Sequence, residues 1–351
     1  MSSGGTSGAN FAPLLDPGGF LTQHGFMTIS SPLSFDVVII GGGAAGLSAA
    51  VALGRARRSV VVLDGGEPRN APASGVHNYL SQDGIRPSEM LRLGRAEAER
   101  YGARLRDSAA VSASKVKDGF TVTTAAGDTF TGRRLLIATG LVDELPDVPG
   151  VRERWGKSVL HCPYCHGWEV RDRAIGVLAT SPKSVHQALM FRQWSENITL
   201  FLHGAPRPSD EETEQLLARG ITLVEGRVES LEGPGDQLTS VRLEDGSTHQ
   251  VDALVVAPVF TARIDLPAQL GVRLAPHPMG MGMQIETDAM GATSVPGVWA
   301  AGNVADLAGQ VVTSADEGLR AVVSLNVDLV AEDTRDAVLA YRAAQAAAPV
   351  K

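Results

Sequence analysis

A glycine-rich turn constrains the fold more than any other part of this 351-residue chain. It follows the hydrophobic run Phe-Asp-Val-Val-Ile-Ile at residues 35–40, which is typical of a buried strand. The turn reads Gly41-x-Gly43-x-x-Gly46, and a helix pattern then extends to about Arg57. The first glycine permits the tight turn, the second lets the backbone approach a pyrophosphate, and the third lets helix and strand pack closely. The segment therefore predicts a dinucleotide-binding strand-turn-helix unit.

An acidic residue in the expected place supports this prediction. A second predicted strand, residues 59–63, ends at Asp64, which stands 23 residues after Gly41. A carboxylate there can accept hydrogen bonds from ribose hydroxyls, while the amides at the helix N-terminus face the phosphates. Strand, turn, helix, strand and acid occur in the required order, which favours a dinucleotide site over a chance glycine-rich turn.

Composition limits the remaining classes. With 44% hydrophobic residues, 39 glycines and only 5% aromatic residues, the chain suits an α/β fold of two domains better than a β-sandwich. A net charge of −8 argues against nucleic acid as a partner. The sequence contains no run of 18 apolar residues, so it predicts no membrane span. No Lys or Arg precedes residue 55, so the basic part of a secretory signal is missing. We therefore expect a cytoplasmic protein with no membrane partner.

The order of elements along the chain predicts two nucleotide-type units. Residues 1–33 are rich in Ser, Gly and Pro and predict a disordered tail, within which Met27 offers an alternative start. A second β-α-β pattern occupies 174–202, and a final strand-turn-helix opens at Val298. The other predicted elements are a helix at 85–104, an antiparallel meander at 109–115, 119–125 and 128–138, a strand at 251–257 and an Ala-rich helix at 336–348.

The two cysteines of the chain stand three residues apart in His161-Cys162-Pro163-Tyr164-Cys165-His166. A C-x-x-C pair can close a short disulfide, and local amides and charges can stabilise one of its thiolates. Histidine can carry a proton to or from a thiol at neutral pH. The stretch therefore predicts redox chemistry, with His166 as the first candidate acid/base group and His161 as the second.

Three other interpretations of this stretch agree less well with its residues. Inert buried thiols are disfavoured by the flanking His, Pro and Tyr. Haem attachment matches Cys162-x-x-Cys165-His166 literally but normally needs an exported, oxidising context. A zinc site is disfavoured because ligands adjacent in sequence chelate one tetrahedral ion poorly and no second C-x-x-C exists. We therefore predict no metal site.

Taken together, these motifs resemble the low-molecular-weight thioredoxin reductase family of flavoproteins. The resemblance covers about residues 34–351 and rests on the first glycine turn, a His-Asn-Tyr segment with Asn78, Ala138-Thr139-Gly140, the C-x-x-C pair and the stretch 293–303. It implies two Rossmann-like dinucleotide-binding domains of the three-layer ββα type. The FAD domain would be split into 34–144 and 265–351, around an inserted NAD(P)H-like domain at 145–264 that carries the C-x-x-C pair.

The resemblance also implies which residues contact FAD. Arg69 and Asn70 could instead form a plain turn, and Thr313 could serve only as a helix N-cap. Asn303 replaces the usual Asp of the C-terminal motif, but an amide can still hydrogen-bond a flavin ribityl or phosphate group. The implied FAD contacts are Gly41, Gly43, Ala45, Gly46, Asp64, Gly65, Arg69, Asn70, Asn78, Ala138, Thr139, Gly140, Gly302, Asn303, Gln310, Val311 and Thr313.

The central domain departs from the NADPH-using members of the family. Where those members have a glycine-rich turn, this chain reads Val-Leu-Ala-Thr-Ser-Pro-Lys-Ser at 177–184. Side chains at Ala179 and Ser181 would crowd a pyrophosphate, and Pro182 removes an amide donor. The place of the 2′-phosphate clamp reads Leu-His-Gly-Ala-Pro at 202–206, with no paired arginine. We expect NADP(H) binding to be weak or absent.

A second departure is His166, which stands where typical thioredoxin reductases have Asp. Cys-Pro-Tyr-Cys-His-Gly-Trp-Glu looks like the branch of FAD-dependent dithiol oxidases that close disulfides in natural products such as gliotoxin and holomycin. That branch implies a small-molecule dithiol substrate, O2 as acceptor and H2O2 as product. By the same resemblance Cys162 is the interchange sulfur, Cys165 faces the flavin, and the protein is a homodimer.

The sequence is also compatible with two other functions. One is a thioredoxin-reductase-like disulfide reductase fed by NADPH or another donor. The other is a flavin-bound redox sensor without turnover. Trp168 could line a substrate pocket or only pack, and the Met-rich segment 278–283 could line an apolar pocket or form a plain loop.

Overall fold

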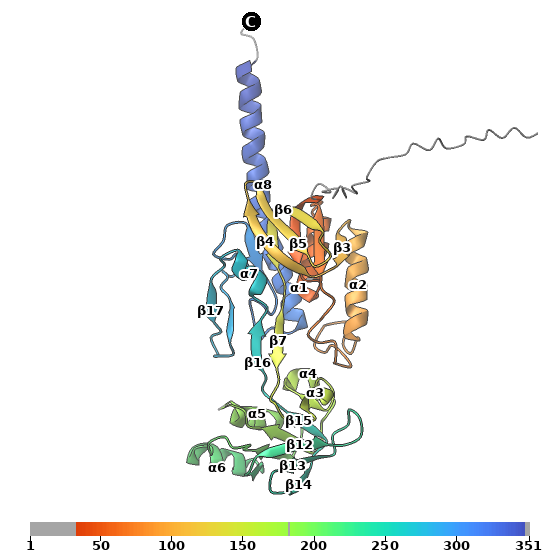
Figure 1. Ribbon diagram of the computed structural model, residues 1–351, viewed down its shortest axis with the longest axis vertical. Coiled ribbons are helices and arrows are strands. Elements are labelled where there is room, and N and C mark those ends of the chain that lie inside the picture. The colour runs from red at the N-terminus through yellow and green to blue at the C-terminus, as the bar shows by residue number, and fades with distance from the viewer. Residues whose placement is uncertain (1–32, 182, 348–351) are drawn as a thin grey trace, which may run out of the picture. The chain divides into compact units, whose positions relative to one another are not determined.

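The computed structural model describes residues 33–181 and 183–347, which belong to one compact unit of the chain. Two main sheets, one all-parallel and one with both parallel and antiparallel strands, organise these residues (Figure 1). The predicted tail at 1–33 lies outside the described residues except for Leu33, with which the first strand begins, and Met27 and Pro182 also lie outside them.

The first sheet is formed by segments from both ends of the chain. Four strands run in the order β3-β2-β1-β6 and are parallel, and β5 and β4 continue from β6 as an antiparallel meander. Strand β19 pairs in parallel with β6, with Val298 opposite Leu135. The C-terminal part of the chain therefore completes the sheet that the N-terminal part begins. The strands are β1 (Leu33–Ile40), β2 (Val60–Asp64), β3 (Arg104–Asp107), β4 (Ala110–Val116), β5 (Gly119–Thr124), β6 (Thr129–Ile137) and β19 (Val298–Ala300).

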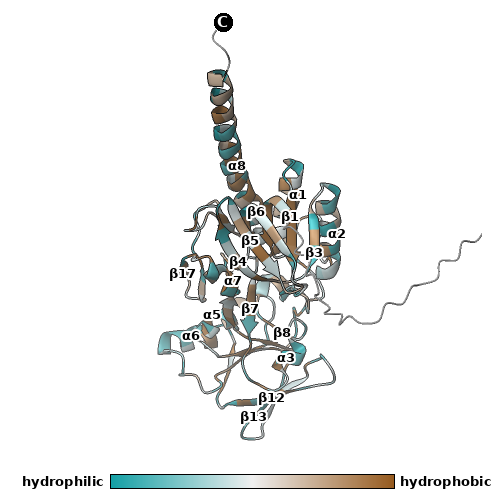
Figure 2. Cartoon of the chain, turned by 45° about the horizontal axis from the view of Figure 1, so that its top comes forward, coloured by the Kyte–Doolittle hydropathy of each residue, from teal (hydrophilic) through white to brown (hydrophobic). Residues whose placement is uncertain are grey.

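Helices cover this sheet and enclose a core. The apolar residues of α1 (Ala44–Arg55) lie between the sheet and α8 (Val311–Ala347), in a cluster that includes Leu53, Trp299 and Leu325. Helix α2 (Pro87–Arg100) is mostly hydrophilic, whereas β1, β5 and β6 carry hydrophobic residues (Figure 2). Because the central strands are buried, they consist of apolar runs, and these runs predicted them correctly from the sequence.

The second sheet forms the inserted module. Its five strands run β11-β10-β9-β15-β8 and all pair in parallel. Helix α5 (Ser184–Phe191) follows β9, and α6 (Asp210–Ala218) follows β10 and begins with a capping box at Ser209. The strands are β8 (Val159–Leu160), β9 (Ile175–Leu178), β10 (Ile198–Phe201), β11 (Thr222–Val224) and β15 (Ala253–Val255). The expected fold class, two Rossmann-like units in one α/β chain, is confirmed.

Smaller elements connect and flank the two sheets. Strands β7 (Leu141–Glu144) and β16 (Val259–Ala262) pair antiparallel, on the two stretches that lead into and out of the inserted module. A three-stranded sheet is made of β12 (Val228–Glu232), β13 (Ser240–Leu243) and β14 (Thr248–Gln250), and a hairpin of β17 (Leu274–Pro276) and β18 (Met283–Ile285). Short helices are α3 (Val151–Arg154), α4 (Pro163–His166) and α7 (Asp265–Gln269).

Several element boundaries predicted from the sequence are wrong. The predicted helix 85–104 ends at Arg100, and its last residue begins β3 instead. Strand β3 reads Arg-Leu-Arg-Asp, a polar edge strand without the apolar run on which the prediction relied. The Ala-rich stretch at 336–347 is not a separate helix, because α8 runs without interruption from Val311. It carries no Gly or Pro after Gly318 that would end a helix.

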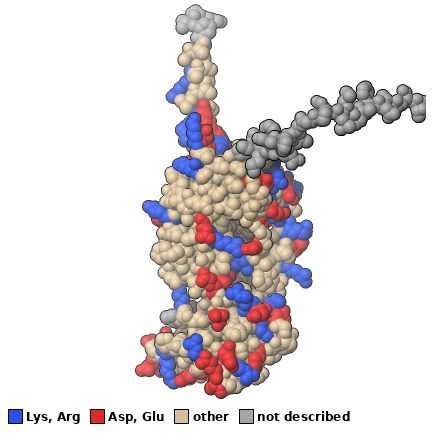
Figure 3. Space-filling model, viewed as in Figure 1, with Lys and Arg blue, Asp and Glu red and all other residues tan. Residues whose placement is uncertain are grey.

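Two surface properties bear on possible partners. None of the helices among the described residues is long and apolar enough to cross a membrane. On the face shown in Figure 3, basic and acidic side chains are interspersed rather than gathered into a basic strip.

Candidate active site

One cavity of about 810 Å³ brings together most of the residues that the sequence singled out. It is lined by the first glycine turn, the end of β2, the loop after β6, the start of α8 and the cysteine pair. Gly46, Asn78 and Thr313 do not line it. The predicted residues that do are Gly41, Gly43, Ala45, Asp64, Gly65, Arg69, Asn70, Ala138, Thr139, Gly140, His161, Cys162, Cys165, His166, Gly302, Asn303, Gln310 and Val311.

The glycine turn has the geometry that a dinucleotide needs. Gly41 adopts φ +111°, which favours glycine, and a side chain there would overlap the carbonyl of Ala138. A Cβ at Gly46 would overlap the carbonyl oxygen of Gly41, whereas a Cβ at Gly43 would meet no protein atom within 4 Å and would stand in the cavity. The backbone at Gly43 is therefore open to a ligand, and the site fits the pyrophosphate of FAD.

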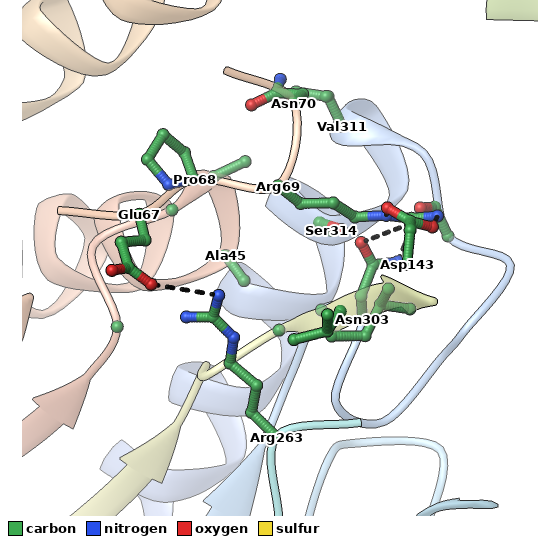
Figure 4. Close-up of a pocket in the computed structure, with 18 of the residues that line it drawn as sticks. Ala45, Glu67, Pro68, Arg69, Asn70, Asp143, Arg263, Asn303, Val311 and Ser314 are labelled. Carbon is green, nitrogen blue, oxygen red and sulfur yellow. Dashed lines mark hydrogen bonds and ion pairs between the residues drawn. The ribbon is translucent and has the colours of Figure 1, made fainter. Parts of the chain in front are cut away.

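An arginine that the sequence left ambiguous joins three parts of the cavity wall. The Nε and Nη2 atoms of Arg69 donate to the two carboxylate oxygens of Asp143 at 2.8 and 2.7 Å, and Nη1 donates to Oδ1 of Asn303 at 3.2 Å (Figure 4). Its guanidinium also lies 4.8 Å from the ring centre of Phe260. Asp143 and Phe260 come from β7 and β16, so no local pattern could have predicted this cluster. Nearby, Arg263 pairs with Glu67 at 3.6 Å.

Asn303 has a structural role that an aspartate could not fill. Its Nδ2 donates to the carbonyl oxygens of Asp306 and Gly309 at 2.9 and 2.8 Å. A carboxylate in the same place would face both carbonyls without a hydrogen to donate. The amide therefore fastens the loop between β19 and α8.

We expect Asn303→Asp to destabilise the protein by about 1–3 kcal/mol, because two partly buried acceptors lose their donor. Urea unfolding of the FAD-free protein measures this change. Asn70→Asp makes the same change of charge at the same cavity and is the control. Equal losses of stability in the two variants would contradict the role assigned to Asn303.

The cysteine pair forms a disulfide at one wall of this cavity. Cys162 and Cys165 are bonded to each other, with their Cα atoms 5.3 Å apart. Cys162 is the N-cap of α4, and its Sγ accepts a hydrogen bond from the backbone N–H of Cys165 at 3.2 Å. Pro163 occupies the first helical position, where its missing N–H costs nothing. A short helix of this kind holds both sulfurs at the surface of the cavity.

The two histidines beside the pair are held differently. Nδ1 of His161 lies 3.0 Å from the carbonyl oxygen of Val256, which only accepts, so Nδ1 carries the proton and Nε2 keeps its lone pair. The Nε2 of Gln187 donates to the carbonyl of His161 at 3.1 Å, and Phe260 packs edge-on against the ring. Burial lowers the pKa of His161 and also that of His166, where the charge of Glu169 opposes the effect. Both imidazoles are therefore neutral at pH 7.

The sequence favoured a plain surface charge at Glu317, on the first turns of α8, and did not predict its partial burial. Its Oε2 accepts a hydrogen bond from the backbone N–H of Gly302 at 2.7 Å. Burial raises the pKa of Glu317 to about 7, and the negative charge of Asp306 acts in the same direction. The folded protein therefore binds a proton at Glu317 over a pH range in which the unfolded chain does not.

We expect Glu317→Gln to stabilise the protein at pH 8 and to change little at pH 5. The folded-state pKa lies above the ordinary value of 4.5, so the wild type loses stability as pH rises from about 4.5 through 7, and the variant does not. Thermal melting at both pH values measures the difference. Asp316→Asn is the matched control, because it removes one negative charge from the exposed neighbouring position on α8, where Asp316 pairs with Arg320. A pH-independent shift for Glu317→Gln would contradict the assignment.

Other residues from the sequence analysis lie apart from this centre. Trp168 is 65% exposed, lies 4.1 Å from the guanidinium of Arg171 and does not line the cavity. Thr313 lies inside the first turn of α8, so it is not an N-cap. The Met-rich segment forms the turn of the β17–β18 hairpin, and Met281 lines the cavity.

A dinucleotide turn and a disulfide that line the same cavity define a class of protein, the flavin-dependent thiol/disulfide oxidoreductases. Comparison with known proteins gives the family. Residues 35–318 match the pyridine nucleotide-disulphide oxidoreductases, and the chain belongs to that family. The resemblance to thioredoxin reductase-like flavoproteins, found from the motifs, is thereby confirmed.

Individual relatives agree with this assignment. The chain is 33% identical to thioredoxin reductase sirT of Leptosphaeria maculans over 320 residues, which cover 86% of this chain and 96% of that protein. It is 33% identical to thioredoxin reductase aclD of Aspergillus oryzae over 291 residues, which cover 78% and 90%. Among solved structures, HlmI is 46% identical with a TM-score of 0.83, and the match covers 90% of this chain and 98% of HlmI.

Proposed function

We propose that this protein is an FAD-dependent dithiol oxidase that closes a disulfide in a small molecule, with O2 as electron acceptor and H2O2 as product. The observation that carries the proposal is the shared cavity, which the Cys162–Cys165 disulfide and the dinucleotide turn both line. FAD bound there would take an electron pair from the reduced cysteines and deliver it to O2. The net reaction converts one dithiol and one O2 into one cyclic disulfide and one H2O2.

The cysteines carry the chemistry with the substrate. A substrate thiolate attacks Sγ of Cys162, which breaks the Cys162–Cys165 bond and releases Cys165 as a thiolate. The second substrate thiolate then attacks the substrate sulfur of this mixed disulfide, and Cys162 leaves as a thiolate. The substrate departs oxidised by two electrons, and the cysteine pair holds those electrons.

Histidine accepts the proton that each attacking thiol must lose. The sequence favoured His166 for this role, with His161 as the second candidate. The hydrogen bond from Nδ1 to Val256 supports His161, because it leaves Nε2 of this cavity-lining residue as a neutral base. His161 therefore takes the base role in this proposal, and His166 remains as a second proton carrier on the other side of the pair.

Local hydrogen bonds in the inserted module support weak or absent NADP(H) binding. After β9, the backbone N–H of Ser181 donates to Oγ of Ser184 at 3.4 Å, and the N–H of Lys183 donates to Oγ of Ser181 at 3.3 Å. Phosphate-binding turns leave such amides to the ligand. The side-chain ammonium of Lys183 donates to the carbonyl of Met279, so it does not face a phosphate.

The residues at the position of the 2′-phosphate clamp, 202–206, also form hydrogen bonds within the module. His203 adopts a left-handed backbone, φ +50°, and its Nδ1 accepts a hydrogen bond from the backbone N–H of Val228 at 3.0 Å. Burial lowers the pKa of His203, so it carries no charge for a phosphate at neutral pH.

Oxygen consumption tests the proposed reaction. A panel of small dithiols added to the holoenzyme should consume O2 and produce H2O2 in equal amounts, whereas a monothiol at the same thiol concentration should react much more slowly. Turnover with NADPH and a thioredoxin, without O2 uptake from dithiols, would establish the disulfide reductase instead. A reduced flavin that O2 reoxidises only slowly would establish the sensor.

Homodimer formation, expected from the resemblance, has support from α8. Its outer face carries exposed apolar side chains at the 3–4-residue spacing of a helix–helix seam, including Val323, Val327, Val330 and Tyr341. Light scattering of the purified protein measures the oligomeric state. The cytoplasmic location and the boundaries of the three folded segments stay predictions from the sequence.

A further inference from the structure

We propose that His77 and Asn78 are positioning residues that hold the redox disulfide at the flavin cavity. They lie on the 76–85 loop, between β2 and α2, whereas the disulfide lies on the redox segment, residues 162–169, of the inserted module. The inference deepens the proposed function, because it concerns how the cysteine pair is kept where electrons can pass to FAD.

Asn78 contacts the redox segment between the two cysteines. Its Nδ2 donates to the carbonyl oxygen of Tyr164 at 2.8 Å. The carbonyls of a one-turn helix such as α4 need partners outside the helix, and Asn78 supplies one. Because Asn78 does not line the cavity, this contact gives it a role other than the FAD contact expected from the sequence.

His77 contacts the other end of the same segment. Its Nε2 lies 3.4 Å from Oε1 of Glu169, and its Nδ1 lies 3.4 Å from Oδ2 of Asp83. The two neighbouring side chains thus reach the redox segment at Tyr164 and at Glu169, on either side of Cys165. Two contacts fix both the position and the orientation of a short segment, which a single contact cannot do.

The 76–85 loop is itself held in an unusual conformation. Asn78 adopts φ +62°, a left-handed conformation uncommon for residues other than glycine. Its backbone N–H donates to Oδ1 of Asp83 at 3.0 Å, and a β-bridge between Val76 and Ile85 closes the loop. Strain kept in place by several surrounding contacts is typical of functional positions.

Substitutions at Asn78 can separate the amide from the backbone conformation. Asn78→Gly keeps the left-handed backbone accessible and removes the amide, and Asn78→Asp keeps the size but sets a carboxylate against the Tyr164 carbonyl. Ser81→Gly is the matched control, because Ser81 lies on the same loop, is exposed and also has a left-handed φ of +69°. All three are prepared as holoenzymes, and their FAD content is measured first.

The test combines two rates. Anaerobic mixing with excess dithiothreitol measures flavin bleaching, which should be at least about tenfold slower in both Asn78 variants and unchanged in Ser81→Gly. Alkylation of the reduced cysteines by iodoacetamide, followed by mass spectrometry, should be at least about threefold faster in the Asn78 variants, because the segment is no longer held at the cavity wall.

The outcomes distinguish this inference from the proposed function. If Asn78→Gly matches Ser81→Gly in both rates, the positioning role is refuted. If Asn78→Gly loses FAD while its cysteines are alkylated at the wild-type rate, Asn78 is a cofactor contact and the inference is also refuted. If dithiothreitol fails to bleach the wild type, the proposed electron path is wrong, and the alkylation rates alone decide the positioning role.

Discussion

Replacing either cysteine by serine is expected to lower dithiol oxidation by about a thousandfold or more, because each sulfur has a covalent task that no neighbour can take over. Cys162 and Cys165 are bonded to each other and line the same cavity. The loss should appear in the rate of O2 consumption with a saturating dithiol, while FAD content stays at the wild-type level.

The two variants should differ in the covalent adduct that the remaining cysteine forms. Cys165→Ser keeps Cys162, the sulfur that the substrate attacks in the proposed mechanism, as a free thiol. Thiol–disulfide exchange with a small disulfide should therefore give a mixed disulfide at Cys162 and release one thiol, detectable as an added mass. Cys162→Ser keeps Cys165 as a free thiol and should form this adduct more slowly than Cys165→Ser does. Turnover near the wild-type rate in either variant, or faster adduct formation at Cys165, would contradict the assigned roles.

Gly46→Ala is expected to destabilise the fold and to abolish FAD binding. Its Cβ would overlap the carbonyl oxygen of Gly41 and come within 3.3 Å of Ile39, so α1 would have to move away from β1. Overpacking of this kind costs about 1–3 kcal/mol, and here it also displaces the amides that face the pyrophosphate. Thermal melting and the FAD content of the purified protein measure the two effects.

Gly43→Ala separates those effects. A Cβ at Gly43 meets no protein atom within 4 Å, so the folded chain should be as stable as the wild type without FAD, whereas FAD binding should weaken. If Gly46→Ala melts at the wild-type temperature, or if Gly43→Ala binds FAD as tightly as the wild type, the glycine turn does not hold the pyrophosphate as described.

Local patterns predicted the parts of the site that are contiguous in sequence. The glycine turn, Asp64 and the C-x-x-C pair each carry their chemistry within a few residues, and the structure places them around one cavity. The apolar runs of β1 and β6 likewise marked the centre of the first sheet.

Contacts between distant segments could not be predicted in this way. Arg69 meets Asp143 and Asn303 only because β7 and the β19–α8 loop fold onto the same cavity. The Asn303 amide donates to two carbonyls of its own loop, a contact that the sequence alone does not reveal. Burial raises the pKa of Glu317, although its neighbours in the sequence are mostly polar. Asn78 appeared in a family motif, yet its partner Tyr164 lies in the inserted module.

The proposed reaction requires electrons to enter through the cysteine pair rather than through a nicotinamide. Anaerobic mixing of the oxidised holoenzyme with a small dithiol and, separately, with NADPH tests this in one instrument. The dithiol should bleach the flavin absorbance within the time of a catalytic turnover, and NADPH should leave it unchanged over the same interval. Rapid bleaching by NADPH alone would contradict the account.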